Sequence, residues 1–293
     1  MKTRSHSRRP TAFPTARRAC RLAVIVGLMA SVYACGGGGG DSPEPAPAPS
    51  PVPAPAADKS CTGPAMEEVV QSLKLVSVNN IGIQPHNCQV VGSADGAPVE
   101  AGKRAYQIML KPGDCGGNDG YDDCKNDRAR FELSETVGTP TQGRTLVREF
   151  RVYLPQQERL RPRGPNLMFL SQLNFGDSSS FGTLAYLELG SDGDLYVRTH
   201  KGLTWEVQNL YPVYRNPYGK WISVRYEVQS TATADGTLKV YVDDKLMVDE
   251  VRQTLPSPQG VNYLRVGIYN AFLTQATEPY AQQVVYYDGI KGR

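Results

Sequence analysis

The 293-residue sequence lacks several features that would place it in common protein classes. Its one long apolar run, LAVIVGLMASVYA at residues 22–34, is too short to span a membrane as a helix. No CxxC pair is present, which argues against a structural zinc site. Strand-like and helix-like segments do not alternate, which excludes a parallel α/β sheet. What remains is a series of short β-like segments behind a distinctive N-terminus.

An excess of positive charge is also absent once the N-terminus is set aside. The whole chain has a formal charge of +3, but residues 1–35 hold seven of its 32 Lys and Arg and no acidic residue. The rest of the chain has 25 basic and 29 acidic residues, which gives a net charge of −4. The charge of the mature chain therefore argues for neither nucleic acid nor a polybasic membrane patch, so an anionic partner needs a local cluster of cations.

The N-terminus is typical of an export signal. A basic stretch, MKTRSHSRRPTAFPTARRACR, precedes the apolar run, and VYAC then ends at Cys35. This ending resembles the lipobox of bacterial lipoproteins, which implies that residues 1–35 are a signal peptide and that Cys35 carries the lipid anchor. Gly36 follows rather than Asp, which by the same analogy favours the outer membrane. A soluble secreted protein and an uncleaved anchor are the alternatives.

Behind this signal lie a tether and one domain. Residues 36–58, GGGGGDSPEPAPAPSPVPAPAAD, are Gly-rich and then Pro/Ala-rich and cannot bury a core. Residues 59–293 have the size of a single all-β domain, expected to be monomeric. Four cysteines fall in it, and an even number in an exported domain suggests two disulfides. Cys115 and Cys124 close a short Gly/Asp loop, which leaves Cys61 to pair with Cys88.

The apolar pattern of the domain predicts an all-β fold. Runs of alternating or continuous apolar residues recur between turn residues. Only MEEVVQSLKLV at 66–76 could be a helix. Many strands without intervening helices favour a two-sheet antiparallel β-jelly-roll sandwich, concanavalin-like. The expected strands are 104–111, 128–134, 145–154, 166–175, 183–190, 194–200, 221–229, 236–244, 245–251, 263–270 and 282–291.

Three of these segments repeat polar or ionisable residues at i and i+2, on one face of a strand. Such a face makes a poor core, and it would suit an acidic sugar chain. Cross-strand salt bridges on an exposed sheet, an ordinary polar face and half-buried supporting tyrosines are the alternatives. The residues are Arg128, Arg130 and Glu132, then Gln172 and Asn174, then Tyr263, Arg265 and Tyr269.

The same three segments resemble motifs of alginate lyases. RFELS is similar to their R-x-E-L-R strand, QLN lies where they carry Q-[IV]-H, and YLRVGIYN resembles YFKAGVYNQ. The hairpin GTLKVYVDDKLMVDE and the tail VVYYDGIKG resemble the closing strands of jelly-roll polysaccharide lyases, including the glucuronan lyase and heparin lyase I types. The resemblance implies a polysaccharide lyase that cleaves a uronic-acid-containing glycan by β-elimination.

The resemblance also implies roles for individual residues. Arg130 and Gln172 would grip the uronate carboxylate, as donors that stabilise a developing negative charge. Tyr269 would be the acid and could also serve as the base, which would require a cation near its hydroxyl. Glu132 would orient Arg130, and Arg265 would bind substrate at the position of the family's lysine. Further substrate contacts are expected from Arg128, Tyr263, Arg198 and His200.

Two departures from the family's motifs leave the base open. Asn174 stands where the family has histidine, so it could serve only to neutralise the carboxylate. Ser134 stands where R-x-E-L-R ends in arginine, and Arg128 could replace that charge. If a histidine is needed, His86 or His200 must supply it, although each could equally be a structural imidazole.

The loop GDCGGNDGYDDCKND offers a calcium interpretation beside a structural one. Its carboxylates at Asp114, Asp119, Asp122, Asp123 and Asp127 are hard oxygen donors. Their spacing does not fit an EF-hand, however, and Gly, Asn and Asp are what any disulfide-closed turn favours. The lyase reaction requires no cofactor, so calcium, with Asp119, Asp122 and Asp123 as ligands, is an option only.

Other functions are compatible with the same fold. A non-catalytic glycan-binding module would explain the missing histidine. A glycoside hydrolase needs two carboxylates that flank the bond, and no E-x-D-x-x-E strand occurs in the sequence. A structural lipoprotein is the remaining alternative. Because one arginine cannot distinguish mannuronate, guluronate, glucuronate or sulfated chains, the sequence does not specify the polymer.

Overall fold

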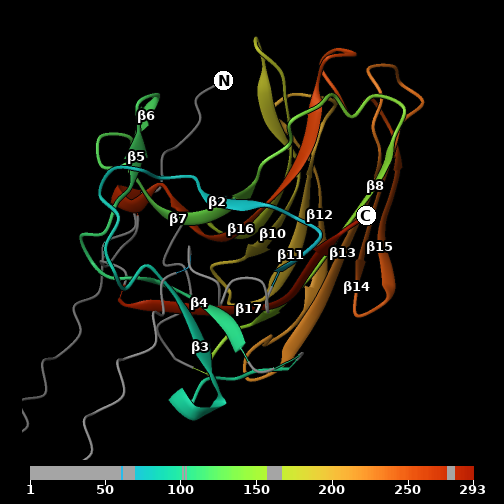
Figure 1. Cartoon of the computed structure of the whole chain (residues 1–293). Coiled ribbons are helices and arrows are strands. Elements are labelled where there is room, and N and C mark those ends of the chain that lie inside the picture. Colours follow the sequence, from blue (N-terminus) through green and yellow to red (C-terminus); the bar gives the residue numbers. More distant parts are fainter. Residues whose placement is uncertain (1–60, 62–69, 101, 103, 157–166, 276–280) are drawn as a thin grey trace, which may run out of the picture. The chain divides into compact units, whose positions relative to one another are not determined.

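The fold is a sandwich of two β-sheets, seen in a computed structural model of the chain (Figure 1). The structure describes residue 61 and residues 70–100, 102, 104–156, 167–275 and 281–293. Residues 55–293 form one compact unit. The predicted signal peptide with Cys35 and the tether at 36–58 lie outside the described residues.

The larger sheet has eight strands and is antiparallel apart from β1 (Val70–Gln71), which pairs parallel with the C-terminal strand. Its order mixes early and late segments of the chain, as expected for a jelly roll. The order is β15 (Lys245–Val251), β14 (Thr237–Val242), β13 (Trp221–Gln229), β8 (Thr145–Tyr153), β17 (Gln283–Gly292), β4 (Arg104–Leu110) and β3 (Cys88–Gly92).

The second sheet has seven antiparallel strands and carries all three sequence motifs. A short hairpin and two 3-10 helices complete the described structure: β5 (Gly117–Asn118), β6 (Tyr121–Asp122), η2 (Ser93–Asp95) and η3 (Leu273–Gln275). The order of the second sheet is β12 (Val207–Tyr214), β11 (Leu195–His200), β10 (Phe181–Leu189), β9 (Leu167–Gly176), β16 (Val261–Ala271), β7 (Arg128–Glu135) and β2 (Leu75–Ser77).

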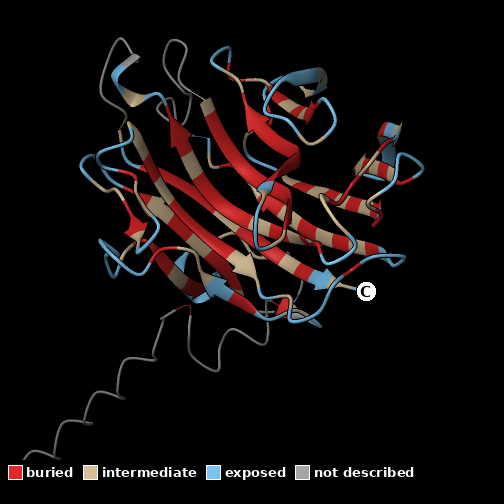
Figure 2. Cartoon of the chain, turned by 90° about the horizontal axis from the view of Figure 1, so that it is seen from above, coloured by how far each residue is buried: buried red, intermediate tan, exposed pale blue. Residues whose placement is uncertain are grey.

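Alternating apolar side chains build the core between the sheets. In β13, for example, Ile222, Val224, Tyr226 and Val228 are buried while the residues between them are partly exposed. Seen from above, the long strands are buried through most of their length, and exposed residues gather in the loops around them (Figure 2). Burial of this apolar surface is the main driving force for the fold.

Two buried tyrosines of the larger sheet also hydrogen-bond across the core. The Tyr226 hydroxyl lies 2.8 Å from Ser171 Oγ in β9. The Tyr287 hydroxyl lies 2.7 Å from the carbonyl oxygens of Leu170 and Gly267, where the pairing of β16 with β9 is irregular. A bulge leaves backbone groups without ladder partners, so the hydroxyl of Tyr287 satisfies carbonyls that the bulge exposes.

The prediction of an all-β jelly-roll sandwich is confirmed, and so are all eleven expected strands, whose ends shift by two residues at most. Both disulfides are confirmed as well, with Cα–Cα distances of 5.7 Å for Cys61–Cys88 and 5.3 Å for Cys115–Cys124. The helix at 66–76 is wrong over its described part, because Val70–Gln71 and Leu75–Ser77 are strands. Residues 66–69 lie outside the described residues.

Strands β3 and β12 were not expected from the sequence. The motif of β12, VQNLYPVY, contains Pro212, which normally argues against a strand. Because β12 is at the edge of its sheet, and its register shifts near Pro212, the missing N–H is tolerated. In the described part of the chain, no helix is both long enough and apolar enough to cross a membrane.

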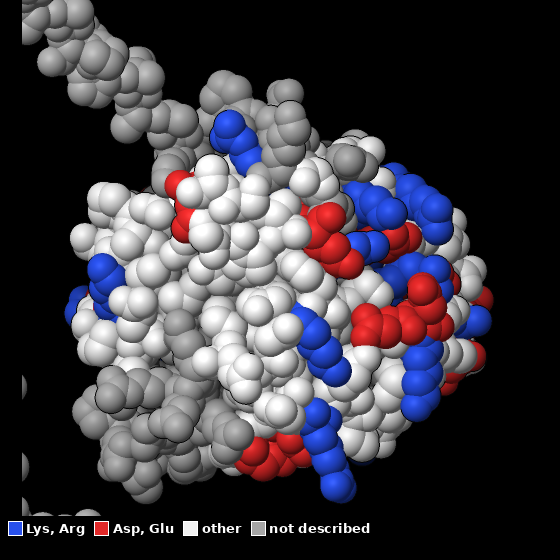
Figure 3. All heavy atoms as spheres, turned by 90° about the horizontal axis from the view of Figure 1, so that it is seen from below, with Lys and Arg blue, Asp and Glu red and all other residues white. Residues whose placement is uncertain are grey.

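Charges of both signs lie side by side on one face of the molecule (Figure 3). From below, basic and acidic side chains lie next to each other on one half of the view (Figure 3). On the larger sheet, Lys291 pairs with Glu149 at 2.8 Å and Arg225 with Glu227 at 3.3 Å. Partly exposed pairs of this kind contribute little to stability.

Candidate active site

The strand register brings the three sequence motifs together. In β16, Tyr269 lies opposite Arg130 of β7 on one side and Phe169 of β9 on the other. Farther along β16, Arg265 lies opposite Gln172. The side of the sheet that faces away from the core is called the polar face. It carries the predicted residues Arg128, Arg130, Glu132, Gln172, Asn174, Tyr263, Arg265 and Tyr269.

Arg130 is the centre of a tightly packed cluster. Its Nε and Nη2 donate to the two carboxylate oxygens of Asp123, each at 2.6 Å. The guanidinium carbon lies 4.4 Å from the ring centres of both Tyr121 and Tyr269. Glu132, which was expected to orient Arg130, is the more distant carboxylate, with Oε2 at 3.7 Å from Nη1. Asp123 is therefore the main partner of Arg130. The expectation that Glu132 orients Arg130 is corrected, because Asp123 does so.

Glu132 belongs instead to a buried polar network. Gln172 donates through Nε2 to Glu132 Oε1, and the hydroxyl of Thr183 donates to Asn174 Oδ1 at 2.6 Å. One atom of this network, Asn174 Nδ2, has no hydrogen-bond partner among the described residues, and Glu132 Oε2 has only its 3.7 Å ion-pair contact with Arg130. Buried polar atoms are almost always paired in folded proteins, so the unpaired amide donor of Asn174 indicates a place for a ligand.

The remaining cations differ in how they are paired. In the part of the chain that the structure describes, no carboxylate pairs with Arg265, whose Nη2 donates only weakly to the Tyr263 hydroxyl at 3.4 Å and whose buried Nε has no acceptor. Arg198, expected to bind substrate, forms a two-pronged ion pair with the buried Glu188. Arg265 thus has a charge available for an anion, whereas the charge of Arg198 is already balanced.

Arg128 does not replace the arginine that Ser134 lacks. The two residues occupy opposite ends of β7, six positions or about 20 Å apart. Ser134 lies opposite Arg265, whereas Arg128 lies opposite Ala271. Arg128 donates to the backbone oxygen of Asn126 at 3.4 Å. The expected replacement is therefore wrong, and the cation beside Ser134 is Arg265.

Tyr269 is held between Arg130 and the ring of Phe169, whose centre is 5.6 Å away. Burial raises the pKa of the Tyr269 hydroxyl. Arg130 and Arg128 act in the opposite direction, but Glu132 and Asp123 add to the increase. The nearby cation therefore does not bring the pKa of this phenol toward neutrality, and Tyr269 is protonated at neutral pH.

The two histidines considered as bases lie elsewhere. His86 pairs with Asp114, with Nε2 and Oδ2 at 2.7 Å. His200 lies at the end of β11, with Nδ1 at 3.2 Å from the Thr183 carbonyl, and burial lowers the pKa of its imidazole. Three strand spacings, roughly 14 Å, separate β11 from β16, whereas Thr183, which His200 contacts, pairs with Asn174.

The acidic loop contributes to the site without a metal cluster. Asp123 faces Arg130, Asp122 pairs with Lys125 at 2.9 Å, and Asp127 accepts hydrogen bonds from Thr274. Among the described residues, no group of three or more His, Cys, Asp or Glu side chains is arranged to hold a metal ion. The carboxylates of the loop therefore point to separate partners, and the calcium interpretation gains no support.

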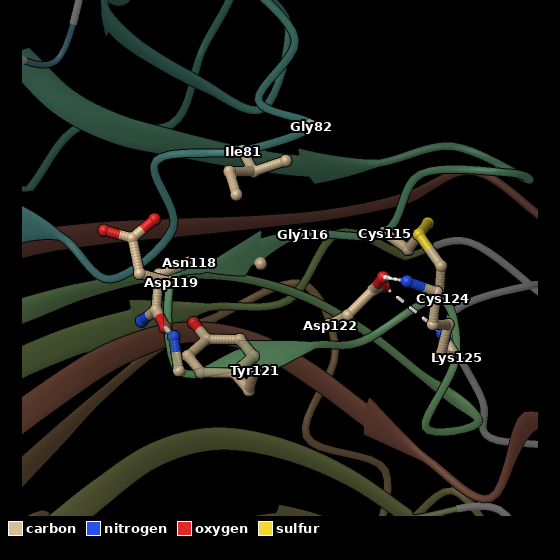
Figure 4. Close-up of a pocket in the computed structure, with 12 residues that line it drawn as sticks. Ile81, Gly82, Cys115, Gly116, Asn118, Asp119, Tyr121, Asp122, Cys124 and Lys125 are labelled. Atoms are coloured by element: carbon tan, nitrogen blue, oxygen red, sulfur yellow. Dashed lines mark hydrogen bonds and ion pairs between the residues drawn. A yellow bond between two sulfur atoms is a disulfide. The ribbon is translucent and has the colours of Figure 1, made fainter.

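A cavity of about 500 Å³ adjoins this loop, lined by the disulfide hairpin and by Ile81 and Gly82 (Figure 4). Figure 4 shows Tyr121 and Asp122 projecting from the hairpin strand, with Lys125 beside Asp122. The ring of Tyr121 lines the cavity and also packs on Arg130, so the cavity borders the polar face at this residue.

Several members of the site were not singled out from the sequence. Tyr121 and Asp123 lie in the acidic loop, where only a metal role was considered for Asp123. Tyr186 and Glu188 of β10 follow the same i, i+2 rule that revealed the other polar strands. Tyr186 stacks on Phe169 with ring centres 4.1 Å apart, so applying that rule to LAYLEL would have extended the polar face by one strand.

The protein is a jelly-roll sandwich with arginine, amide and tyrosine side chains on one face of its second sheet. More specifically, residues 87–291 match the family model described as polysaccharide lyase, and the chain belongs to this family. The protein is thus a polysaccharide lyase, and the resemblance carried by its three motifs is confirmed. No curated protein is similar enough to the chain to count as a match.

Solved structures of lyases share the fold. The alginate lyase AlyC3 is 11% identical, with a TM-score of 0.52 over 80% of this chain and 95% of that one. A variant of the alginate lyase Aly36B in complex with an alginate tetrasaccharide is 11% identical, with a TM-score of 0.50 over 75% and 96%. The endo-β-1,4-glucuronan lyase of the fungus Trichoderma reesei is 16% identical, with a TM-score of 0.48 over 76% and 87%.

Proposed function

We propose that this polysaccharide lyase cleaves a uronic-acid-containing glycan by β-elimination. The observation that carries the proposal is that Arg265 and Asn174 have buried hydrogen-bond donors on the polar face without acceptors among the described residues. A buried arginine nitrogen without an acceptor and a buried amide NH₂ without an acceptor lie on adjacent strands. A carboxylate would satisfy both donors, and the structurally similar AlyC3 and Aly36B are alginate lyases.

The reaction requires that the carboxylate of the sugar be neutralised before the weakly acidic proton beside it can leave. We assign this step to Arg265 and Asn174, because hydrogen bonds that strengthen as charge develops lower the barrier. Gln172 lies opposite Arg265 and is fixed by Glu132, so it is positioned to support the same carboxylate. Arg130 has its donor edge occupied by Asp123, so its role is to position Tyr269.

Tyr269 is assigned the protonation of the departing glycosidic oxygen. A general acid must hold its proton until the bond breaks, and the raised pKa of Tyr269 ensures this at neutral pH. The same raised pKa argues against this phenol as the base in its resting state, so the proton that leaves the sugar carbon passes to a separate base. The sequence-based expectation that Tyr269 serves as both acid and base is therefore narrowed to the acid step.

The decisive experiment is an elimination assay on alginate, glucuronan, heparin-type and pectic polymers, followed by the ultraviolet absorbance of unsaturated uronate products. Tyr269→Phe should lower kcat by about 10² to 10⁴ and Arg265→Met by about 10² to 10³. Tyr286→Phe and Arg225→Met are matched controls on the other sheet and should retain activity.

Failure to release unsaturated product from any of the four polymers would refute uronate cleavage. Binding without turnover would instead establish the alternative of a non-catalytic glycan-binding module. If product forms at the wild-type rate with Tyr269→Phe, then the acid is another residue, even though the protein is a uronate lyase.

Export and lipid anchoring through Cys35 complete the proposal. Two disulfides require an oxidising compartment, which supports a domain that acts outside the cytoplasm. Cys35→Ser should move the full-length protein from the membrane fraction to the soluble fraction. An unchanged distribution would contradict the anchor.

A further inference from the structure

Aromatic rings continue from the candidate active site across the polar face. Phe169 contacts Tyr269 on one side and stacks on Tyr186 on the other, with ring centres 5.6 and 4.1 Å apart. Tyr186 contacts the His200 ring at 5.3 Å, and His200 contacts Trp205 at 6.0 Å. The row therefore crosses four adjacent strands, from β16 to β11, and ends in the loop that follows β11.

The end of this row is exposed, unlike its middle. Trp205 is 61% exposed and Phe181 is 74% exposed, whereas Phe169, Tyr186 and His200 are each 5% exposed. Trp205 and Phe181 lie at the same end of the second sheet, in the β11–β12 loop and at the start of β10, and their rings meet edge to face at 6.5 Å. Neither ring contributes to the core, so folding does not account for a tryptophan at this position.

The charges around this pair of rings are balanced. Arg198 pairs with Glu188, Arg252 with Glu250 at 3.1 Å and Lys201 with Glu206 at 3.8 Å. Unlike Arg265, each of these three cations already has a carboxylate partner among the described residues, so a further carboxylate gains little there. What the two rings offer is a flat apolar surface, which complements the C–H face of a pyranose ring.

We propose that Trp205 and Phe181 form a distal subsite that stacks against one sugar ring of the same glycan chain, several residues from the bond that is cleaved. The occupant is identified by continuity, because the aromatic row links this surface to Tyr269 without a gap. Four strand spacings, roughly 19 Å, separate β7 from β11, which is enough for a chain of several sugars. The inference rests on the proposed function and adds a preference for long substrates.

Steady-state kinetics on substrates of two lengths test the subsite. Trp205→Ala should lower kcat/KM on the polymer roughly fivefold to tenfold, mainly by raising KM. A change of this size is expected when one aromatic contact with the substrate is lost. The loss on the shortest cleaved oligosaccharide should be much smaller. Trp205→Phe should recover most of the polymer activity, and Leu246→Ala, an exposed apolar residue on the other sheet, is the matched control. Equal losses on both substrates, or no loss on the polymer, would overturn the inference.

The fluorescence of Trp205 provides a readout that does not depend on catalysis. The chain contains two tryptophans, so Trp221→Phe leaves Trp205 as the only one. In a Trp221→Phe/Tyr269→Phe variant, titration with uronate oligosaccharides of increasing length should change the emission only above a minimum length. If the wild type cleaves a polymer but the emission of the variant does not change, the proposed function stands and the subsite is refuted. A change without cleavage of any polymer retains the subsite and removes the proposed function.

Discussion

Replacement of Asp123 by Asn tests whether the ion pair beneath Tyr269 organises the site. Asp123 is 1% exposed and the side chain of Arg130 12%, so the substitution leaves a buried guanidinium without its main partner. Removing one member of a buried pair typically costs 3–5 kcal/mol. Glu132 remains 3.7 Å from Arg130 Nη1 and compensates in part, so we expect a loss of about 3 kcal/mol in the free energy of unfolding. For a domain of this size that corresponds to roughly 6–12 °C in Tm.

The same substitution should affect catalysis through Tyr269. Arg130 would no longer be fixed under the tyrosine ring, and misplacement of a catalytic group by about 1 Å can cost on the order of a hundredfold in rate. The charge of Asp123 also raises the pKa of Tyr269, so its removal should shift the alkaline decline of kcat to lower pH. A merely structural role for Asp123 would not shift this pH profile.

Thermal melting followed by circular dichroism and elimination kinetics well below Tm are the assays. Asp249→Asn is the matched control, because Asp249 forms an exposed pair with Lys239 at 3.8 Å and its loss should stay within about 0.5 kcal/mol. In a double-mutant cycle with Arg130→Met, the combined loss should be smaller than the sum of the two single losses. If Asp123→Asn melts within about 2 °C of the wild type and keeps its pH profile, the reasoning is refuted.

His200, Gly267 and the Cys115–Cys124 disulfide allow three further tests. Burial holds the pKa of His200 below its usual value of about 6.5, so the unfolded chain binds the proton first and stability present above that pH is lost as pH falls. His200→Gln should therefore flatten the decline of Tm below about pH 6.5, and an unchanged slope would contradict this. Gly267 has a φ of +151°, and a Cβ there would lie 2.2 Å from the Phe131 carbonyl oxygen. Gly267→Ala should therefore lower the free energy of unfolding, measured by denaturant titration, by about 2 kcal/mol or more. A loss below about 1 kcal/mol would argue against strain at this position. The double variant Cys115→Ser/Cys124→Ser should cost about 2–3 kcal/mol and lower kcat more than loss of the other disulfide does, whereas equal effects on kcat would separate this loop from the site.

Much of the fold could be predicted because it follows from local patterns. Alternation of apolar residues reveals a strand wherever one face is buried, and it located eleven strands to within two residues. The exceptions have local causes. Pro212 makes the sequence of the edge strand β12 look unlike a strand. The strands Val70–Gln71 and Leu75–Ser77 are too short to show alternation of apolar residues, and the composition around them favours a helix.

The sequence predicts which face of the sheet carries the candidate site, but it does not predict the ion-pair partner of each arginine. Alternation assigns Arg130, Gln172 and Tyr269 to one side of their strands, and the register then makes them neighbours. It says nothing about which carboxylate each arginine meets, because that depends on loop geometry and strand order. Asp123 contacts Arg130 from the disulfide loop that precedes β7, and Arg128 is far from Ser134 because the two lie at opposite ends of one strand.

Ion pairing is therefore what separates the roles of arginines that look alike in the sequence. A guanidinium that already donates to a buried carboxylate gains little from a second anion, since its charge is compensated and its donor edge is occupied. Arg130 and Arg198 are in this state, with Asp123 and Glu188 as partners, so they are suited to hold neighbouring side chains in place. Arg265 lacks such a partner in the described structure, and its charge is felt in full by an incoming carboxylate. Although the arginine of RFELS is the residue that resembles the family motif, substrate charge should thus be read mainly at Arg265, and salt should weaken binding of polymer to the wild type more than to Arg265→Met.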